Sequence, residues 1–275
     1  MDKYTFINGG ISAKYRESLD TLNRELTGPF SATEAIRVLQ VSPSKANRLL
    51  AYFAERGWLS RLRRGLYTTV PLGATNPSER RNDPWVMADK IFSPCYIGGW
   101  SACEFWELTE QIFNDVVVFT TRRSRKQRVS VKNINYLIKT VSQAKLFGMK
   151  TVWKEEIKVS ISDPSRTIID ILNDPAIGGG IRNIADVLKE YFNSNHRSDI
   201  RLIEYLSLMK NRAINKRLGF LIETLKIDAK ELTNYCKSNI SAGYSKLDPT
   251  IEAKGNYVRR WNLMINVSLT NEELK

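Results

Sequence analysis

Apolar residues recur at helical spacing near the start of the chain, with short polar stretches between them. Tyr15, Leu19, Leu22 and Leu26 fall on one face of a helix that we expect over residues 11–26. A helix with one apolar stripe buries that stripe against its neighbours. The pattern therefore predicts that this helix opens a small helical domain.

Two further helices are predicted by their capping residues. Ser31 and Glu34 stand at capping-box spacing, so a helix is expected to start after Ser31 and to run through Leu39. Ser42 can cap the next helix, in which Pro43 takes the first position because proline has no amide hydrogen to lose there. Two short helices joined by a tight turn are typical of a helix-turn-helix.

The third helix has an apolar face and a cationic face. Its apolar stripe consists of Ala46, Leu49, Leu50 and Phe53. Small and cationic side chains gather at the amino-terminal end of the other face, where a recognition helix meets base edges and phosphate groups. The residues that we expect to contact DNA from this end are Ser44, Lys45, Asn47 and Arg48.

A basic β-hairpin is predicted after the third helix. Residues 58–62 and 66–70 have the composition of strands, and Gly65 between them can take the positive φ that a tight hairpin needs. The arginines expected beside a phosphate backbone are Arg61, Arg63 and Arg64. Helices and hairpin together predict a winged helix-turn-helix. The alternative is a small helical domain whose arginines are only solvated.

The rest of the chain predicts a larger mixed domain. Residues 71–84 are rich in proline, glycine, asparagine and charge, which favours a linker. Strands are expected at residues 116–120, 129–131, 135–139 and 156–161. Asp163 and Pro164 predict a helix start, and Gly178 to Gly180 a flexible break. From residue 181 onward the spacing is mainly helical, and residues 261–267 predict an edge strand.

These patterns predict the fold class α+β. We expect an amino-terminal winged helix-turn-helix domain at residues 1–75 and a larger mixed α/β domain at residues 76–275. The second domain divides into a mixed α/β part at residues 76–162 and a mainly helical part with a closing strand at residues 163–275.

The net charge of the chain indicates which kind of partner it binds. The chain has 42 Lys and Arg against 29 Asp and Glu, a net charge of +13, which favours a polyanion such as nucleic acid. An anionic membrane is the alternative, but the sequence has no long apolar run, signal pattern or lipidation motif. Three scattered cysteines, Cys95, Cys103 and Cys236, predict reduced, buried thiols. We therefore expect a cytoplasmic protein without a membrane partner.

The densest cluster of cations lies between the expected strands of the second domain. It consists of Arg122, Arg123, Arg125, Lys126 and Arg128, with Lys132 close by. The cluster could be a second nucleic-acid contact, a site for an acidic partner or a solvated hairpin. A further basic patch is expected on the helical layer at Lys210, Arg212, Lys216 and Arg217.

Candidate catalytic residues are few. Glu156 and Lys158 have the Glu-x-Lys spacing of metal-dependent nucleases, and Asp115 could supply a second carboxylate. Asp163 and Asp170 are expected to be a helix cap and a surface charge. The single histidine, His196, lies in a polar stretch between helices. We expect no catalytic residue, no cofactor and no metal.

Several stretches, taken in order, carry a resemblance to a known family. They are RRGLYTTVP (63–71), YIGGWSACEFWELTEQ (96–111), VVVFTT (116–121), DPSRTIIDIL (163–172), RLGFLIETL (217–225), YSKLDP (244–249) and WNLMINVS (261–268). Their order resembles that of the AbiEi-type antitoxins, the regulatory half of type IV toxin-antitoxin pairs. The chain departs from this family at Cys103 and Glu107, where the family tends to have leucine and glycine.

The resemblance implies a winged helix that binds inverted repeats in double-stranded DNA of its own promoter and represses the operon. It also implies a carboxyl-terminal domain that counteracts a nucleotidyltransferase-like toxin without needing a stable complex. Two alternatives stay open from the residues alone. One is a plain transcriptional regulator whose second domain senses a ligand, and the other is a Mg²⁺-dependent nuclease.

Overall fold

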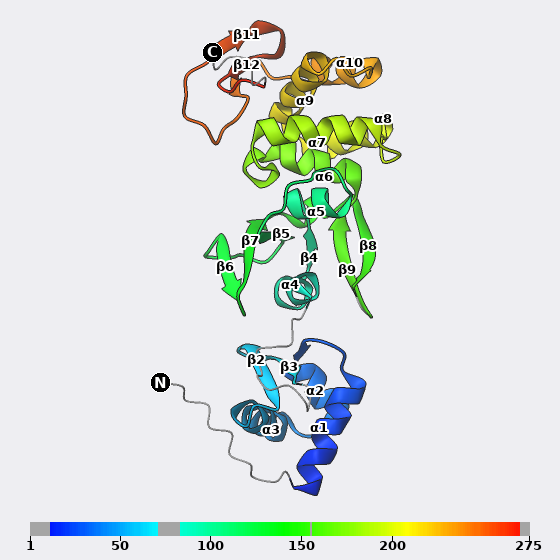
Figure 1. Cartoon of the computed structure of the whole chain (residues 1–275), viewed down its shortest axis with the longest axis vertical. Helices are drawn as coiled ribbons and strands as arrows, with labels where there is room; N and C mark the ends of the chain where they lie inside the picture. The colour runs from blue at the N-terminus through cyan, green and yellow to red at the C-terminus, as the bar shows by residue number, and fades with distance from the viewer. Residues whose placement is uncertain (1–11, 71–82, 155, 270–275) are drawn as a thin grey trace. The chain divides into compact units, whose positions relative to one another are not determined.

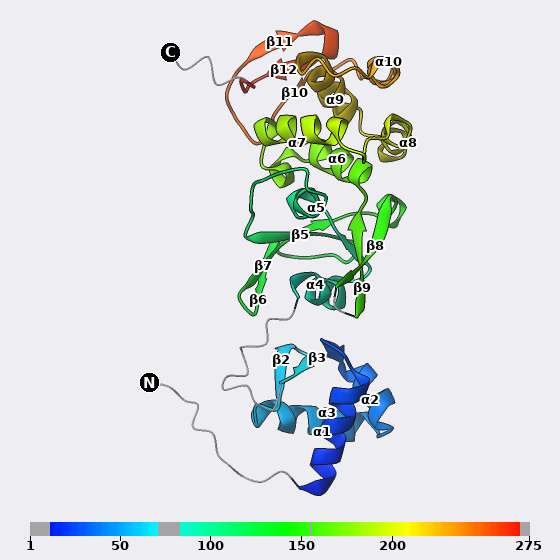
Figure 2. The ribbon, with the colours of Figure 1, turned by 45° about the vertical axis from the view of Figure 1, so that its right-hand side comes forward.

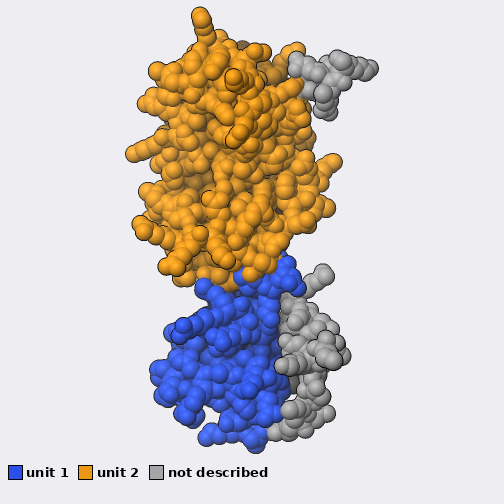
Figure 3. Space-filling model, turned by 90° about the vertical axis from the view of Figure 1, so that its left-hand side faces the viewer, with its two compact units in different colours: residues 1–90, 131–133, 154–157 blue, residues 91–130, 134–153, 158–275 orange. Residues whose placement is uncertain are grey.

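The computed structural model describes residues 12–70, 83–154 and 156–269 (Figure 1, with a second view in Figure 2). The chain divides into two compact units, one of residues 1–90, 131–133 and 154–157 and one of the remainder (Figure 3). The expected fold class is confirmed, since a winged helix-turn-helix is followed by a larger mixed α/β region. Residues 71–82 of the expected linker, with the boundary after residue 75, lie outside the described residues.

Residues 12–70 of the first unit form three helices packed beside a small antiparallel sheet. In chain order the elements are α1 (Ala13–Glu25), β1 (Phe30–Ser31), α2 (Ala32–Leu39), α3 (Pro43–Glu55), β2 (Leu59–Arg63) and β3 (Leu66–Thr69). Within this segment the strand order is β1-β3-β2, so the hairpin strand β3 pairs with both of the others.

Local hydrogen bonds fix where these helices begin. The Ser31 hydroxyl accepts from the Glu34 amide at 3.2 Å, and the Glu34 carboxylate accepts from the Ser31 amide at 2.7 Å. The predicted capping box is therefore confirmed. The Ser42 hydroxyl caps α3 by accepting from the Lys45 amide at 3.4 Å, with Pro43 at the first position as predicted. The helix ends at Glu55, and Arg56 is its carboxyl-terminal cap.

The apolar stripe of α3 is buried as predicted. Ala46 is fully buried, and Leu49, Leu50 and Phe53 pack into one core with Leu22 of α1. Burying a side chain of this size stabilises the fold by roughly 1.5–3 kcal/mol. Since that stripe must face the core, the opposite side of α3 is left to solvent.

The second unit is built on a mixed sheet. Helix α4 (Pro84–Phe92), of which residues 84–90 belong to the first unit, precedes this sheet in the chain. The strands are β4 (Cys95–Ile97), β5 (Asp115–Thr120), β6 (Arg128–Val131), β7 (Ile134–Thr140), β8 (Met149–Lys154) and β9 (Ile157–Ser162). Among the described residues their order is β6-β7-β5-β4-β9-β8. The β-branched run predicted as a buried strand is β5, which lies inside this sheet, parallel to β7 and antiparallel to β4.

Helices cover one face of this sheet. They are α5 (Gly99–Phe105), α6 (Pro164–Asn173), α7 (Ile181–Asn193), α8 (Asp199–Met209), α9 (Arg212–Thr224) and α10 (Lys230–Ser238), with short 3₁₀ turns at Gln143–Lys145, Pro175–Gly178 and Arg259–Trp261. Figure 2 shows α6 to α10 stacked on the same side of the sheet. None of the helices within the described ranges is long and apolar enough to span a membrane.

The glycine stretch between α6 and α7 is not the flexible break that we expected. Gly178 is buried, and a side-chain carbon added there would lie 2.8 Å from atoms of Ile171 and Ile184. Gly179 and Gly180 have positive φ and turn the chain into α7. Gly178 therefore serves the close packing of α6 and α7, and Gly179 and Gly180 form the turn between them.

The closing strand is also placed differently from the prediction. Residues near the carboxyl terminus form a separate small sheet of β10 (Ser245–Lys246), β11 (Asn256–Val258) and β12 (Leu263–Ile265). Strand β12 lies between the other two, parallel to β10 and antiparallel to β11, so the prediction of an edge strand is wrong. The pattern of apolar residues along 261–267 predicted a strand, but such a pattern does not say which strands pair with it.

A buried ion pair joins the main sheet to the helical layer. Arg166 Nε donates to Asp170 at 3.0 Å, and both side chains are only 1% exposed. The Tyr96 hydroxyl accepts from Arg166 Nη2 at 3.0 Å and donates to Asp170 at 3.1 Å. Asp163 caps α6 as predicted, but the expectation that Asp170 is a surface charge is wrong.

Two cations expected in a basic patch are buried instead. The Lys216 and Arg217 side chains lie inside the helical layer, so this part of the predicted patch is wrong. Arg217 donates to the carbonyl oxygens of Leu172 at 2.8 Å and of Leu247 at 3.0 Å. Burial lowers the pKa of both cations, and the backbone carbonyls supply the contacts that replace water.

Candidate nucleic-acid interface

The polar end of α3 is open to solvent. Ser44, Asn47 and Arg48 are exposed and follow one another at helical spacing on the side opposite the buried stripe. The first turn of α3 has no acidic residue. The partial positive charge of the helix amino terminus and the Arg48 guanidinium therefore favour an anion on this side.

Lys45 is exposed but lies at the margin of this surface. It lines a groove of about 310 Å³ together with Tyr15 and Ser18 of α1 and Gln40 of the turn between α2 and α3. Lys45 therefore borders both this groove and the polar face of α3.

The hairpin carries its arginines on a bulged strand. Arg61 lies opposite Tyr67, and Arg63 lies opposite Leu66, so the register shifts at Leu62. Directly opposite residues share a face, and consecutive residues of β3 face opposite ways. The bulge therefore places Arg61 and Arg63 on different faces of the hairpin.

The tip of the hairpin is formed by Arg64 and Gly65. Arg64 is exposed, and Gly65 has φ of +75°, in the left-handed region that favours glycine. Within the described residues, and apart from its two chain neighbours, nothing lies within 4 Å of a side-chain carbon built on Gly65. Glycine is thus required here by backbone conformation and not by space, which is the role that the sequence predicts.

The second cationic cluster lies on the loop between β5 and β6 and at the start of β6. All of its members are exposed: Arg122, Arg123, Arg125, Lys126 and Arg128. Arg128 forms an ion pair with Asp115, and Arg122 donates to the carbonyl oxygen of Ile91 at 3.5 Å. The backbone is held by the Ser124 hydroxyl, which donates to the Lys126 carbonyl at 2.6 Å.

The residues considered for nuclease chemistry have other surroundings. Glu156 is exposed in the turn before β9, outside the strand on which the Glu-x-Lys pattern would place it. Asp115 is paired with Arg128. His196 is exposed in the connection between α7 and α8, as expected, with its ring 5.6 Å from that of Trp106. No three His, Cys, Asp or Glu side chains in the described parts of the chain could hold one metal ion.

The predicted state of the cysteines is confirmed. Cys95, Cys103 and Cys236 are buried, and none of them forms a disulfide within the described residues. Burial raises the pKa of the Cys103 and Cys236 thiols to about 12, so these thiols stay protonated near neutral pH.

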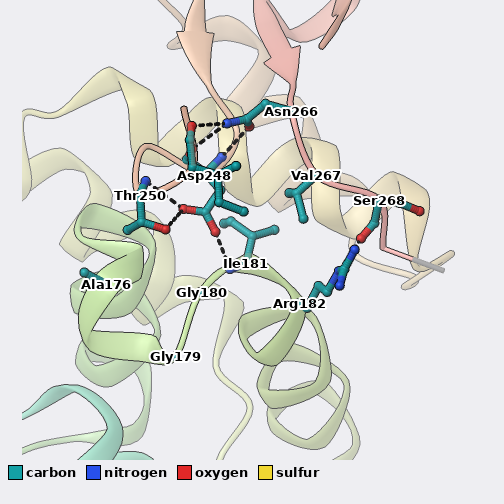
Figure 4. A pocket seen from close by; sticks show the side chains of 11 residues that line it. Ala176, Gly179, Gly180, Ile181, Arg182, Asp248, Thr250, Asn266, Val267 and Ser268 are labelled. Atoms are coloured by element: carbon teal, nitrogen blue, oxygen red, sulfur yellow. Dashed lines mark hydrogen bonds between the residues drawn. The ribbon is translucent and has the colours of Figure 1, made fainter. Parts of the chain in front are cut away.

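The second unit contains a cavity of about 650 Å³ at the start of α7 (Figure 4). Asp248 Oδ2 accepts from the Ile181 amide at 3.0 Å, and its Oδ1 accepts from the Thr250 amide at 2.9 Å. Arg182 Nε donates to the carbonyl oxygen of Ser268 at 2.8 Å. These polar groups hold the carboxyl-terminal segment against α7, so they have a structural role.

The segment that carries α3 and the hairpin has known relatives. Residues 17–70 match the family of AbiEi antitoxin transcriptional regulators. The resemblance stated from the sequence is confirmed over this segment, which contains all of the α3 and hairpin residues discussed above. No curated protein matches the chain.

Two of the stretches quoted from the sequence beyond residue 70 pack against each other. Gly219 lies under the Trp261 ring, where an added side-chain carbon would be 2.1 Å from ring carbon Cη2. Trp261 Nε1 donates to Glu223 at 2.7 Å. Two of the stretches, 217–225 and 261–268, therefore form one packed unit, and their residue types follow from that contact.

The backbone at Glu107 has a conformation that favours glycine. Glu107 has φ of +57°, in the left-handed region where glycine is preferred. The amides of Glu107 and Leu108 donate back to the carbonyl oxygens of Glu104 and Cys103, at 3.1 and 2.9 Å, in a Schellman motif that ends α5. Glycine at this position fits that motif without strain.

Proposed function

We propose that the protein is an antitoxin and autorepressor. Its winged helix binds inverted repeats in its own promoter, and its carboxyl-terminal domain counteracts a nucleotidyltransferase-like toxin. The observation that carries the DNA-binding role is the exposed row of Ser44, Asn47 and Arg48 within a segment that matches the AbiEi regulators. We propose no catalytic role and no cofactor.

The division of labour within the winged helix follows from residue type. Asn47 and Arg48 can bond base edges in the major groove, Lys45 flanks them, and Ser44 lies near a phosphate. The hairpin arginines neutralise phosphates on either side of the wing. Because the bulge separates Arg61 from Arg63, Arg61 is assigned to one face of the hairpin and Arg63 to the other. Arg64 is assigned to the tip.

The decisive experiment is a binding assay on the DNA directly upstream of the gene, compared with a scrambled duplex, at several salt concentrations. Arg64→Ala should weaken binding to both duplexes and reduce the slope of log K against log salt by about 0.9. Asn47→Ala should reduce the preference for the upstream DNA and leave the slope unchanged. Lys189→Ala, which removes an exposed charge from α7, is the matched control.

Equal binding of the upstream and scrambled duplexes by the unaltered protein would contradict the role of a sequence-specific repressor. An Arg64→Ala slope equal to that of Lys189→Ala would contradict the assignment of the wing. The toxin role is tested separately, by expressing the adjacent gene alone. Growth arrest that this protein relieves supports the antitoxin, and harmless expression supports the plain regulator.

The exposed cations of the β5–β6 loop are proposed as a second, sequence-independent DNA contact. Arg123, Arg125 and Lys126 carry this proposal, because Arg122 and Arg128 already bond within the protein. Counterion release makes such contacts add affinity without specificity. Replacing the three with Ala should lower affinity for both duplexes equally, and unchanged affinity would leave the loop without this role.

A further inference from the structure

The small carboxyl-terminal sheet has one covered face and one open face. Leu263 of β12 is buried, and Val258 opposite it packs against the main core. Successive strand residues point to opposite faces. The next row across the sheet therefore faces away from the core, and it consists of Lys246, Met264 and Tyr257.

Two tyrosines stand together on the open face. Tyr244 precedes Lys246 by two residues and so shares its side of the chain, and its ring centroid lies 4.8 Å from that of Tyr257 at an interplanar angle of 77°. The two residues are 48% and 63% exposed. Rings of this size are usually covered, so an exposed pair marks a binding surface.

The charge around this pair is positive. Between residues 237 and 265 the cations are Lys237, Lys246, Lys254, Arg259 and Arg260, and the acids are Asp248 and Glu252. The Asp248 side chain is buried, and its oxygens accept hydrogen bonds within the protein. Arg260 is paired with Glu223, and Lys246 Nζ donates to the carbonyl oxygen of Ile251 at 3.3 Å. Lys254 and Arg259 are exposed, as is the acid Glu252, so the exposed cations still outnumber the exposed acid.

We propose that this surface, the tyrosine face of Tyr244, Lys246 and Tyr257, binds single-stranded nucleic acid, with the exposed Lys254 of the loop before β11 as a further phosphate contact. Unpaired bases stack on the two rings, and the cations contact the phosphates between them. In a duplex the faces of internal bases are stacked on each other, so the face selects single strands. Surplus positive charge favours this occupant over an uncharged protein surface. The inference does not depend on the function proposed for the winged helix.

The test uses the full chain and a labelled oligothymidylate, which forms no duplex, with unlabelled duplex present in excess to occupy the winged helix. Tyr257→Leu and Tyr244→Leu should each lower affinity for the oligonucleotide by about 5- to 100-fold, with the salt slope unchanged. Tyr257→Phe should bind like the unaltered protein. Lys254→Ala should reduce the salt slope by about 0.7.

The matched control is Trp153→Leu, because Trp153 is another ring that is 63% exposed, on strand β8. It should leave affinity for the oligonucleotide unchanged, and thermal unfolding should confirm that every variant folds. Unchanged binding by the Tyr244→Leu, Tyr257→Leu double variant overturns the proposal. An equal loss of affinity with Trp153→Leu would also overturn it. If the double variant keeps oligonucleotide binding but no longer relieves a toxin, the tyrosine face would instead be assigned to a protein partner.

Discussion

The buried pair of Arg166 and Asp170 offers the sharpest test of the energetics of the second unit. Their side chains are each 1% exposed, and the Tyr96 hydroxyl bridges them. Replacing Arg166 with Met removes the cation but leaves the Asp170 carboxyl group buried. Burial already raises the pKa of Asp170 even with Arg166 beside it, so the variant leaves a charge that nothing in contact neutralises.

Breaking a buried pair from one side costs about 3–5 kcal/mol, because the remaining ion keeps its desolvation penalty. For a unit of this size, that loss corresponds to a fall in Tm of roughly 6–20 °C. The double variant Arg166→Met, Asp170→Leu removes both charges and fills similar space. It should cost much less than the sum of the single variants Arg166→Met and Asp170→Leu.

The assay is urea unfolding followed by circular dichroism for the four proteins of this double-mutant cycle. Lys189→Met serves as a control, because Lys189 and Asp186 form an ion pair of similar helical spacing that is exposed, with 52% and 72% of the side chains accessible. That change should cost at most about 0.5 kcal/mol. If Arg166→Met costs no more than the control, or if the single costs simply add, the assignment of a coupled buried pair is refuted.

Two further predictions concern a pH dependence and a backbone conformation. Partial burial raises the pKa of Glu34, but hydrogen bonds from Lys90 and from Ser31 outweigh it and hold the pKa below 4.5. The carboxylate therefore stabilises the amino-terminal unit above about pH 4.5, and this contribution is lost as pH falls through the lowered pKa. The stability of the Glu34→Gln variant should therefore fall less steeply than that of the unaltered protein as pH decreases through that range. Glu55→Gln, at an exposed position of α3, is the control and should show the same pH dependence as the unaltered protein. Glu107→Gly should raise stability by up to about 1 kcal/mol, because glycine takes a positive φ without strain, and a lower Tm would contradict this reasoning.

Residues 12–70 could be predicted closely because their signals are local. The capping box of Ser31 and Glu34, the Ser42 cap and the turn at Gly65 each depend on residues within a few positions of one another. The stripe of α3 repeats at the spacing of a helix and has one buried face. Chemistry and periodicity pointed to the same structure at each step.

The second unit was less predictable because its charged residues are buried by distant partners. Asp170 is bonded by Tyr96, 74 residues away, and Arg217 by the Leu247 carbonyl, 30 residues away. Contacts between residues so far apart cannot be read from the local sequence pattern. Both side chains were therefore interpreted as surface charges. Strand β4 is only three residues long, and β8 mixes lysines with apolar residues at the edge of the sheet, so neither gave a clear strand signal.

The cap of α7 has a consequence for how the chain is made. The Ile181 amide is bonded by Asp248, which follows it by 67 residues. During synthesis, the start of α7 leaves the ribosome well before Asp248, whose carboxylate accepts the hydrogen bond from the Ile181 amide. The helical layer therefore reaches its final stability late in synthesis, when the segment carrying Asp248 has emerged and docked.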